Sequence, residues 1–547
     1  MIPKDRHIAL TETTSRALEW CREQSKTPGK LSIEEIINET LYHERFRLRG
    51  HVHAPHKDQD KAYWRKIART FPNAGAAQQI EILQQIIHRY GDEIIGHFSP
   101  LFFKALTRYG SKTLSVLLNS MSPIRLASAV ASLESLDDNI TVLGAVDALK
   151  SLSQKGTVIL APTHVSNLDS VVLGYALARI GLPPFLYGAG YNLFKNPIFA
   201  PFLKRLGAYT VDRQKKAPLY KHVLKTYATV SMEMGYHQIF FPGGTRSRSG
   251  RVESRLKKGL LGCGLEAYEM NLRRHKQRPN VYIVPCTLTY QMVLEAETLV
   301  ADYLAEAGKA RYIIEDDESS RVDRMVHFLR TVLRHQSSIH MHIGAAMDPF
   351  GNRVLDDGTS VDQHGRPITI DGYLKQRGVF VHDQQRNEEF TSQVSDKLTE
   401  RYPQGTVVGP THVVAHVLFN MLLAESAGTD LYRVLREGQI HTGFLIDSVR
   451  TEIGAALDAL RTLAADKRLH LDAVALSADV DDVLSRALVC FTVYHAEPAV
   501  ERRGNRVFVL NRALLYYYRN RLQGFPLPHA ATIVGTDKAP AETNAHA

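Results

Sequence analysis

Short apolar runs rich in β-branched residues alternate with helical stretches between about residues 140 and 350, and this alternation constrains the fold most. Helical periodicity separates most of the runs, as in Asp169 to Ile180 and Leu219 to Met234. Apolar strands with interposed helices are typical of an α/β domain. We therefore predict a mixed sheet flanked by helices over residues 136–350. The runs cover residues 140–144, 157–164, 184–190, 207–213, 237–244, 281–290 and 338–347.

The segments on either side of this domain have mainly helical patterns. Ser32 is followed three residues later by Glu35, a capping-box pattern that predicts a helix over Ile33 to Arg49. The aromatic segment His97 to Gly110 is interpreted as a helix packed on the next domain, with a membrane-surface element as the alternative. The predicted regions are a helical N-terminal region at 1–135, a Gly/Asp/Pro-rich loop at 351–372, a helical C-terminal region at 373–522 and a disordered tail at 523–547.

Charge and composition exclude several classes of protein. The formal net charge of +10 over 547 residues suits an anionic partner, whether a phosphate ligand, nucleic acid or acidic lipid. Four scattered cysteines are too few for a disulfide framework or a zinc site, and they fit a reducing compartment. The first residues carry frequent charges and resemble no secretory signal. No run approaches the ~18 apolar residues of a spanning helix, so we expect none.

A histidine and an aspartate five residues apart, His164 and Asp169, stand at a predicted strand-to-helix corner. Such a pair means little alone, and the chain holds a second one, His53 and Asp58, in a polar segment. His164 follows the buried-strand pattern that ends at Pro162, and Asp169 falls in the first turn of the next helix, where the helix dipole favours a carboxylate. Asp169 can orient the imidazole and leave its other nitrogen as a base. The alternative is that Asp169 only caps the helix and His164 fills the corner.

The stretch Phe240 to Arg251 runs from a strand pattern into glycines and three arginines, Arg246, Arg248 and Arg251. Glycines let backbone N–H groups approach an anion closely, and arginines bind phosphate with two donors. The Gly-Lys-Ser/Thr ending of a P-loop is absent. Residues 240–279 hold ten Lys/Arg and three Glu, a local net charge of +7. We interpret this stretch as an anion site; a solvated basic loop is the alternative.

Two further clusters complete an ordered set of four. They are Leu206 to Arg213, a short strand that ends in an arginine, and Val281 to Tyr290, a strand interrupted at Pro285. In order and spacing the four clusters resemble the blocks of the glycerolipid acyltransferase superfamily. The matching positions are His164 and Asp169 for His-x4-Asp, Gly207 and Arg213 for Gly-x5-Arg, 241–247 for Phe-Pro-Glu-Gly-Thr-Arg-Ser, and Pro285 for a strand with a proline.

Within that superfamily the chain is most similar to the membrane-type glycerol-3-phosphate acyltransferases. The similarity lies in three stretches: Gly190 to Arg213, Arg246 to Arg251, and Tyr290 to Glu297. Clear resemblance covers about residues 140 to 300, and the helical C-terminal part fits the family loosely. The resemblance implies an α/β acyltransferase domain.

The resemblance also implies a role for each matching position. His164 is expected to be the general base that takes the proton from the acceptor hydroxyl as it attacks the acyl thioester, and Asp169 is expected to orient it. Pro285 falls in the block associated with the acyl donor. The positions that bind the acceptor and its phosphate are Gly207, Arg213, Gly244, Arg246 and Arg248. The implied reaction transfers a fatty acyl group from acyl-CoA or acyl carrier protein to the sn-1 hydroxyl of glycerol-3-phosphate, giving lysophosphatidic acid.

Two positions depart from the family pattern. Gly243 stands where the superfamily usually has a glutamate, and Asp212 replaces an arginine of the commoner Ile-Arg-Arg. Two alternatives therefore stay open. One is the same chemistry on a lysolipid or dihydroxyacetone phosphate. The other is a non-catalytic protein that binds acyl lipid or acyl-CoA.

The expected partners follow from this substrate class. They are the acyl donor, glycerol-3-phosphate and a membrane surface that the protein contacts peripherally, because a long acyl chain prefers lipid. We expect the protein at the cytoplasmic face of a membrane, the inner membrane if its source is bacterial. The resemblance implies no metal and no bound cofactor. The sequence shows no recognised nucleic-acid motif, so no nucleic-acid partner is expected.

Overall fold

The chain divides into two compact units in the computed structural model, and each is described by itself. The first comprises Met1–Ser247, Val252–Leu294 and Asp316–Thr406, and the second comprises Arg248–Arg251, Glu295–Glu315 and Val407–Ala547. The structure describes residues 1–49, 57–108, 139–191, 203–307, 338–426, 431–436, 443–477, 479–493 and 498–528. Parts of four predicted segments lie outside these residues: 50–56 and 109–135 of the N-terminal region, 136–138, 192–202 and 308–337 of the α/β domain, 427–430, 437–442, 478 and 494–497 of the helical C-terminal region, and 529–547 of the tail.

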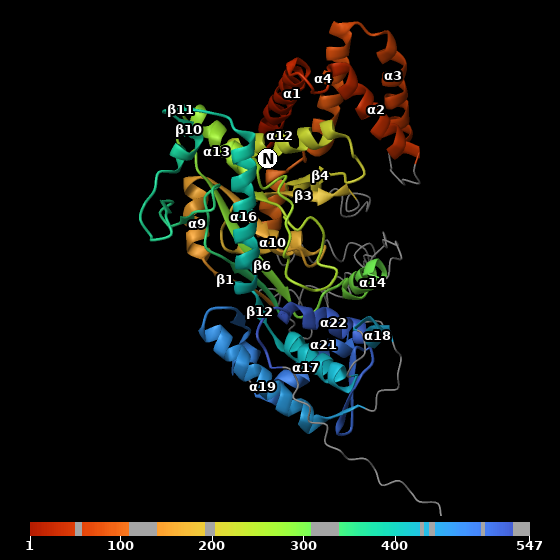
Figure 1. Ribbon diagram of the computed structural model, residues 1–547, viewed down its shortest axis with the longest axis vertical. Helices are drawn as coiled ribbons and strands as arrows, with labels where there is room; N and C mark the ends of the chain where they lie inside the picture. Colours follow the sequence, from red (N-terminus) through yellow and green to blue (C-terminus); the bar gives the residue numbers. More distant parts are fainter. Residues whose placement is uncertain are drawn as a thin grey trace, which may run out of the picture. The chain divides into compact units, whose positions relative to one another are not determined.

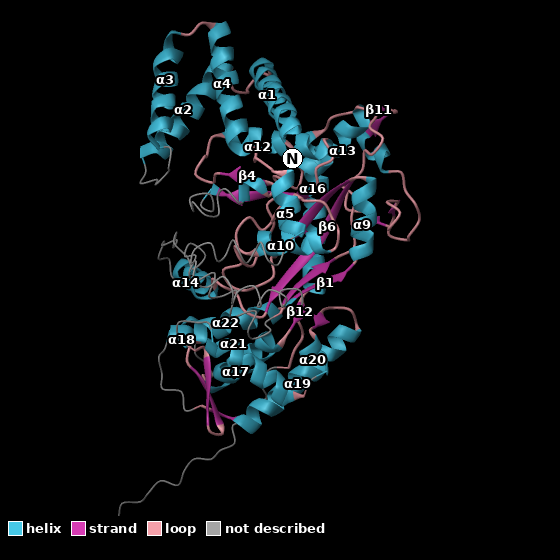
Figure 2. Cartoon of the chain, turned by 180° about the vertical axis from the view of Figure 1, so that it is seen from behind, coloured by secondary structure: helices cyan, strands magenta, loops and turns pink. Residues whose placement is uncertain are grey.

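The first unit contains a mixed sheet flanked by helices (Figures 1 and 2). It has seven strands in the order β1-β7-β6-β2-β5-β3-β4. The five strands from β6 to β4 in that order are parallel. β7 pairs antiparallel to β6, and β1 pairs parallel to β7. The predicted mixed sheet is confirmed, and each strand lies within its predicted run. The strands are β1 (Ile140–Gly144), β2 (Thr157–Pro162), β3 (Leu186–Gly190), β4 (Ala208–Val211), β5 (Gln238–Ile239), β6 (Val281–Tyr290) and β7 (Ile339–Ile343).

Helices α12 (Pro218–Glu233), α13 (Cys263–Arg273) and α16 (Gln384–Gln404) pack on one face of this sheet. Alternate residues of a strand point to the same face. Ile159 and Ala161 of β2 accordingly share a buried cluster with Leu265 of α13, Leu398 of α16 and Met232 of α12. Two further helices contact the sheet, α9 (Val146–Lys155) at β2 and α10 (Asp169–Arg179) at β1.

The N-terminal helices belong to the same compact unit as the sheet. Ser32 and Glu35 form the predicted capping box: the Ser32 N–H donates to the Glu35 carboxylate at 2.8 Å, and the Glu35 N–H donates to Ser32 Oγ at 3.2 Å. α1 and α4 pack against α12, with Tyr90 and Tyr227 in the shared buried cluster (Figure 1). The helices are α1 (Pro3–Lys26), α2 (Ile33–Arg49), α3 (Lys57–Thr70), η1 (Phe71–Asn73), α4 (Ala76–Ile94) and α5 (Pro100–Arg108).

The aromatic segment His97 to Gly110 forms helix α5 and packs at its start on the chain that enters β4. The Ser99 N–H donates to the Arg205 carbonyl at 3.0 Å, and Phe98 is buried. Leu101 is 82% exposed, so α5 also presents apolar surface to solvent. The packed interpretation holds for the first residues; residues 109 and 110 lie outside the described part.

The predicted loop at 351–372 is not wholly irregular. It contains the antiparallel pair β8 (Arg353–Val354) and β9 (Ser360–Val361), and the 3-10 helix η5 (Ile370–Leu374) begins within it. β10 (Lys375–Gln376) and β11 (Val379–Phe380) form a second short hairpin directly after it. Two-residue strands leave no alternation of apolar and polar residues, so the sequence pattern could not indicate them.

The second unit is mainly helical, as predicted for this region, but it also holds strands that the prediction missed. β13 (Phe444–Leu445), β16 (Arg506–Val509) and β15 (Val500–Arg503) form a three-stranded sheet, and β12 (Val407–Val408) pairs with β14 (His470–Leu471). No helix in the described part of the chain is long and apolar enough to cross a membrane. The helices are α14 (Ala296–Ala307), α17 (Pro410–Glu425), α18 (Leu431–Arg436), α19 (Ile446–Ala465), α20 (Ala473–Ser477), α21 (Val480–Val493), α22 (Arg512–Arg519) and η6 (Asn520–Leu522).

A buried histidine in the first unit makes stability depend on pH. The Val158 N–H donates to His237 Nδ1 at 3.0 Å, and burial lowers the pKa of His237 to about 4. Below the ordinary pKa of ~6.5 the unfolded chain therefore binds a proton that the folded chain excludes, and stability falls as pH falls from 6.5 towards 4. We expect a loss of up to about 1.4 kcal/mol per pH unit in that window.

Urea unfolding at pH 7.0 and pH 5.0 checks this expectation. His237→Gln removes one titrating group, so the difference between the two pH values should shrink by about a third in that variant, because burial lowers the pKa of His222 and of His340 to about 4 as well. An unchanged difference would show that His237 is not the group responsible.

Candidate active site

The predicted site residues follow the ends of three parallel strands. His164 comes two residues after β2, Arg213 two residues after β4, and the loop from Phe241 to Ser247 follows β5. The carboxyl ends of parallel strands lie at one edge of a sheet, and this edge is where open α/β sheets bind ligands. The sheet topology therefore places residues that are distant in the sequence along a common edge.

His164 and Asp169 form the predicted pair. Nδ1 of His164 lies 2.8 Å from Oδ2 of Asp169. A carboxylate only accepts hydrogen bonds, so Nδ1 keeps its proton and donates a hydrogen bond to Asp169, and Nε2 carries the lone pair of a base. The ring of His164 stacks on Phe241 with centroids 4.2 Å apart, and its side chain is 16% exposed. Phe241 thus covers one face of the imidazole, and Asp169 holds its Nδ1.

The carboxylate of Asp169 is fully buried and receives four hydrogen bonds. Oδ2 accepts from His164 Nδ1 and from the backbone N–H groups of Val165 at 2.7 Å and Ser166 at 3.1 Å. Oδ1 accepts from the Tyr290 hydroxyl at 2.7 Å. The alternative in which Asp169 only caps the helix does not describe these bonds, because the N-cap of α10 is Leu168 and it has no side-chain cap bond. Asp169 instead holds the imidazole and the backbone of Val165 and Ser166 before the helix. The same carboxylate fixes the corner after β2 and the tautomer of the histidine on it.

The backbone of His164 is held by the segment that follows β5. The Ser247 N–H donates to the His164 carbonyl at 2.8 Å. On the other side, the His164 N–H donates to Oε1 of Glu253 at 2.5 Å. Both peptide groups flanking the histidine are thus held by residues of one loop.

Arg213 joins the same loop through its guanidinium group, which donates to the Gly244 carbonyl. The pKa of Arg213 lies below its usual range because surrounding protein partly desolvates the charged form and because Arg246 adds a second positive charge nearby. Like charges brought together favour the binding of an anion, which relieves their repulsion. The structure thus brings Arg213, Gly244 and Arg246 together, and their role in binding the acceptor stays a prediction.

Gly244 must be a glycine where it stands. Its φ of +74° is a conformation that other residues rarely adopt. A Cβ at this position would also lie 2.6 Å from Cδ and 2.9 Å from Nζ of Lys257. The Lys257 N–H donates to the Pro242 carbonyl at 2.7 Å, so the chain folds back against the glycines and brings a further positive charge to the loop.

Asp212, which departs from the family pattern, shapes the turn that carries Arg213. Its Oδ1 accepts the N–H of Gln214 at 2.9 Å, a turn in which the side chain bonds its own backbone two residues on. Lys215 then pairs with Glu93 of α4, which ties the turn to the N-terminal helices. Asp212 thus has a structural task that does not involve the acceptor.

Gly207 lies at the opposite end of β4 from Arg213. Its φ is +101°, and a Cβ would lie 3.3 Å from the Phe185 carbonyl oxygen. A four-residue strand rises about 13 Å, so the structure does not bring Gly207 to the edge that holds His164. Gly207 instead provides the positive φ that the chain needs directly before β4 begins.

Pro285 lies inside β6, opposite Ala161 of β2 in the parallel register. A proline in an inner strand removes a ladder donor. Here the neighbouring strand β7 ends at Ile343, and the Gly344 N–H donates to the Pro285 carbonyl at 2.9 Å. The missing N–H of Pro285 therefore falls just beyond the residues that pair with β7. Pro285 is buried, and its partner Ala161 precedes His164 by three residues.

Arg248 belongs to the second unit, where its Nη1 pairs with Oε2 of Glu306 at 2.8 Å. Arg251 donates to the Tyr516 hydroxyl at 3.3 Å in the same unit, and the Ser249 carbonyl accepts from Asn520 at 2.8 Å. The role of Arg248 in phosphate binding stays a prediction.

Three residues at this edge were not singled out by the sequence analysis: Glu253, Lys257 and, as a partner of Asp169, Tyr290. Tyr290 lies at the end of β6. The sequence pointed to it only through the stretch from Tyr290 to Glu297 that resembles the family. Lys257 entered only through the local charge of +7. Nothing in the sequence indicated that Glu253 belongs to the site, because its position depends on how the chain after Arg251 folds back to Gly243.

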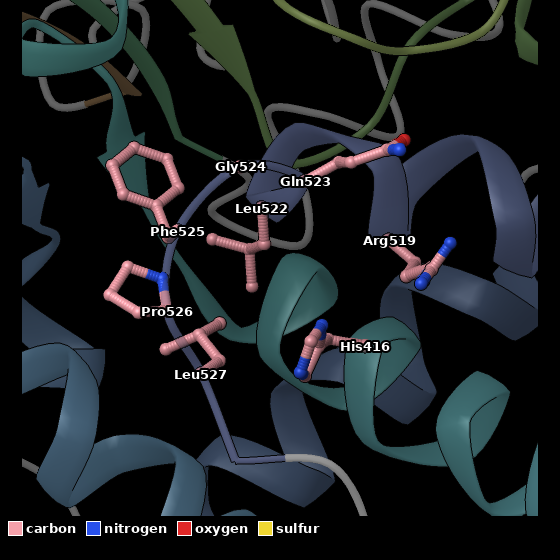
Figure 3. A pocket seen from close by; sticks show the side chains of 8 residues that line it. All are labelled: His416, Arg519, Leu522, Gln523, Gly524, Phe525, Pro526 and Leu527. Atoms are coloured by element: carbon pink, nitrogen blue, oxygen red, sulfur yellow. The ribbon is translucent and has the colours of Figure 1, made fainter.

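A separate cavity of about 280 Å³ lies within the second unit (Figure 3). Arg519 lies 5.2 Å above the Phe419 ring, and Nε2 of His416 lies 2.9 Å from Nδ2 of Asn420. None of the predicted site residues lines it. The lining residues are His416, Arg519, Leu522, Gln523, Gly524, Phe525, Pro526 and Leu527.

The part of the chain that carries this site is similar to a known protein family. Residues 145–289, which span the strands from β2 to most of β6, match the family model described as Acyltransferase. This segment is therefore similar to the acyltransferase family, and the resemblance inferred from the four motifs is confirmed.

Several curated relatives that the chain matches are named glycerol-3-phosphate acyltransferase. One, from Pseudomonas putida strain W619, is 28% identical over 305 residues, which cover 53% of this chain and 32% of the relative. Another, from Pseudomonas putida strain KT2440, is 25% identical over 418 residues, or 73% of this chain and 42% of the relative. A third, from Aeromonas hydrophila, is 32% identical over 221 residues, or 40% and 24%. The matched regions thus span less than half the length of these relatives.

Proposed function

We propose that this protein transfers a fatty acyl group from a thioester donor to the sn-1 hydroxyl of glycerol-3-phosphate. The observation that carries the proposal is the pairing of His164 with buried Asp169 on the sheet edge where Arg213 and Arg246 also lie. The names of the curated relatives support glycerol-3-phosphate as the acceptor. The acyl donor is acyl-CoA or acyl carrier protein.

The chemistry requires a base, positioning and a site for the acceptor's charge. Nε2 of His164 takes the proton from the acceptor hydroxyl while its oxygen attacks the thioester carbonyl. The carbon–sulfur bond then breaks, and the leaving thiolate takes the proton back from the imidazolium. Asp169 stabilises the imidazolium while it exists. A base contributes typically ~10²–10⁴-fold, and holding both substrates in place adds to this.

The arginines suit the acceptor's phosphate. Two guanidinium groups that repel each other bind a dianion more strongly than either does alone. Asp212 and Gly243 were the grounds for considering a different acceptor. Asp212 is explained by the turn after β4, and Gly243 faces Glu253. We therefore favour glycerol-3-phosphate over a lysolipid or dihydroxyacetone phosphate.

We further propose that the reaction takes place at a membrane surface to which the protein binds peripherally. The reason is that the long acyl chain of the donor prefers lipid to water. Acyl transfer measured with and without phospholipid vesicles tests this. A rate that does not respond to vesicles, together with no vesicle sedimentation of the protein, would contradict it.

The test of the main proposal is transfer of a labelled acyl group to glycerol-3-phosphate, lysophosphatidic acid and dihydroxyacetone phosphate in parallel. Acyl-CoA and acyl carrier protein are used as donors in separate reactions. Product at the sn-1 position of glycerol-3-phosphate supports the proposal. A clear preference for another acceptor overturns the choice of substrate, and no transfer to any acceptor leaves the non-catalytic binding alternative.

Arg213→Ala should raise the KM for glycerol-3-phosphate by about 10- to 100-fold, because a hydrogen bond to a charged group is worth about 1.5–3 kcal/mol. The value of kcat should change much less. Arg65→Ala, at an exposed position of α3, is the matched control and should leave both constants unchanged. A KM for glycerol-3-phosphate within twofold of the wild-type value would exclude Arg213 from the acceptor site.

A further inference from the structure

The space beside Gly243 is filled by the side chain of another residue. A Cβ at position 243 would lie 3.0 Å from Cγ and 3.3 Å from Oε1 of Glu253. Gly243 is not among the residues with positive φ, so its backbone would accept any side chain. What stands against a side chain at 243 is therefore the carboxyl group of Glu253, which occupies the volume that such a side chain would need.

That carboxyl group accepts a hydrogen bond from the backbone of His164, the proposed base. Oε1 of Glu253 accepts the His164 N–H at 2.5 Å. Among the described residues, His164 also contacts the Ser247 N–H at its carbonyl, Asp169 at Nδ1 and Phe241 against the ring. Glu253 is thus the contact that fixes the amino side of the histidine, where β2 ends.

We propose that Glu253 is a positioning residue for His164, and that it supplies from ten residues downstream the carboxylate that position 243 lacks. The inference rests on the proposed acyl transfer and adds to it a residue that the four motifs do not contain. The geometry makes the two positions alternatives. A glutamate at 243 and one at 253 would compete for one space, whereas either one alone can place a carboxylate beside the corner that carries His164.

A positioning role predicts an effect on turnover more than on acceptor binding. A displacement of about 1 Å at a reacting group can cost ~10²-fold in rate. We therefore expect Glu253→Ala to lower kcat by about 10- to 100-fold and to leave the KM for glycerol-3-phosphate within about threefold. Glu253→Gln keeps the size and one acceptor oxygen, so it should fall between the wild type and Glu253→Ala.

The deciding experiment moves the carboxylate from one position to the other. The double variant Gly243→Glu/Glu253→Ala should recover at least a tenth of the wild-type kcat. Gly243→Glu alone should lose activity, because two carboxyl groups then need the same space. Glu389→Ala, at an exposed position of α16, is the control and should match the wild type. Urea unfolding of each variant shows whether it is folded.

Hydrogen exchange provides a readout that does not require activity. In wild-type protein the amide of His164 is bonded to Glu253, so a peptide spanning residues 158–166 should exchange slowly. Exchange should become faster in Glu253→Ala and slow again in the double variant, with no change in Glu389→Ala.

The outcomes separate this inference from the proposed function. No acyl transfer by the wild-type protein would refute the proposed function, and the exchange data would still decide whether the two carboxylates are interchangeable. An active wild type with a fully active Glu253→Ala would overturn the inference alone. A folded double variant that is as inactive and as fast in exchange as Glu253→Ala would also overturn it.

Discussion

Replacing His164 with alanine is expected to lower kcat for acyl transfer by about 10²- to 10⁴-fold, the usual contribution of a general base. Nε2 is the nitrogen that Asp169 leaves as the proton acceptor, and alanine has no group to replace it. The KM for glycerol-3-phosphate should stay within a few-fold, because Arg213 and Arg246 remain. Steady-state kinetics with labelled acyl-CoA measure both constants.

Two controls separate a lost base from a lost fold. His88→Ala removes a histidine from an exposed position of α4 and should be fully active. Added imidazole should restore part of the activity of His164→Ala, since a small base can enter the space left by the ring. If His164→Ala retains a third or more of the wild-type kcat, the histidine is not the base and the mechanism proposed above is wrong.

Replacing Asp169 with asparagine is expected to lower kcat by about 10²- to 10⁴-fold as well, but for a different reason. Asparagine has nearly the same shape, yet it carries no charge to stabilise the imidazolium. Its amide NH₂ can also face Nδ1 of His164 and force the proton onto Nε2. Asparagine also has one neutral acceptor oxygen where the carboxylate has two, so part of the donors that now bond Asp169 would lose their acceptor, which should cost about 1–3 kcal/mol of stability.

Tyr290→Phe provides the graded comparison for this prediction. It removes one of the four donors to Asp169 and leaves the pair with His164 intact, so we expect less than a tenfold loss in kcat. Kinetics and urea unfolding of both variants give the two quantities independently. Equal losses of kcat in Asp169→Asn and Tyr290→Phe would show that the charge of Asp169 does not matter.

The strands and the base were predictable because their signals are local. Apolar runs indicated every strand of the seven-stranded sheet, and β6 has the predicted bounds, Val281–Tyr290. His164 and Asp169 are only five residues apart across one turn of the chain, so their closeness in the sequence already predicted that their side chains could meet. Two-residue strands such as β8 and β13 gave no signal, because a pattern of period two needs about four residues to be visible.

The division of the chain could not be deduced from the same patterns. The N-terminal helices and α16 belong to the compact unit of the sheet, while Arg248–Arg251 belongs to the second unit. Whether an apolar helical face packs on one neighbour or another is decided by contacts between distant segments. Arg246 and Arg248 therefore fall in different units although they stand two positions apart.

The sequence by itself determined the residue types of the site: a base with its carboxylate, arginines for a phosphate, and glycines where the backbone must turn. Only the tertiary structure decided which of them act together. It placed Gly207 at the far end of β4 from Arg213, because a strand separates its two ends by its full length. It brought Glu253 against Gly243 and His164, because the chain after the arginines folds back on the glycines. The return of the chain to Gly243 does not depend on spacing in the sequence, and so it could not be predicted from it.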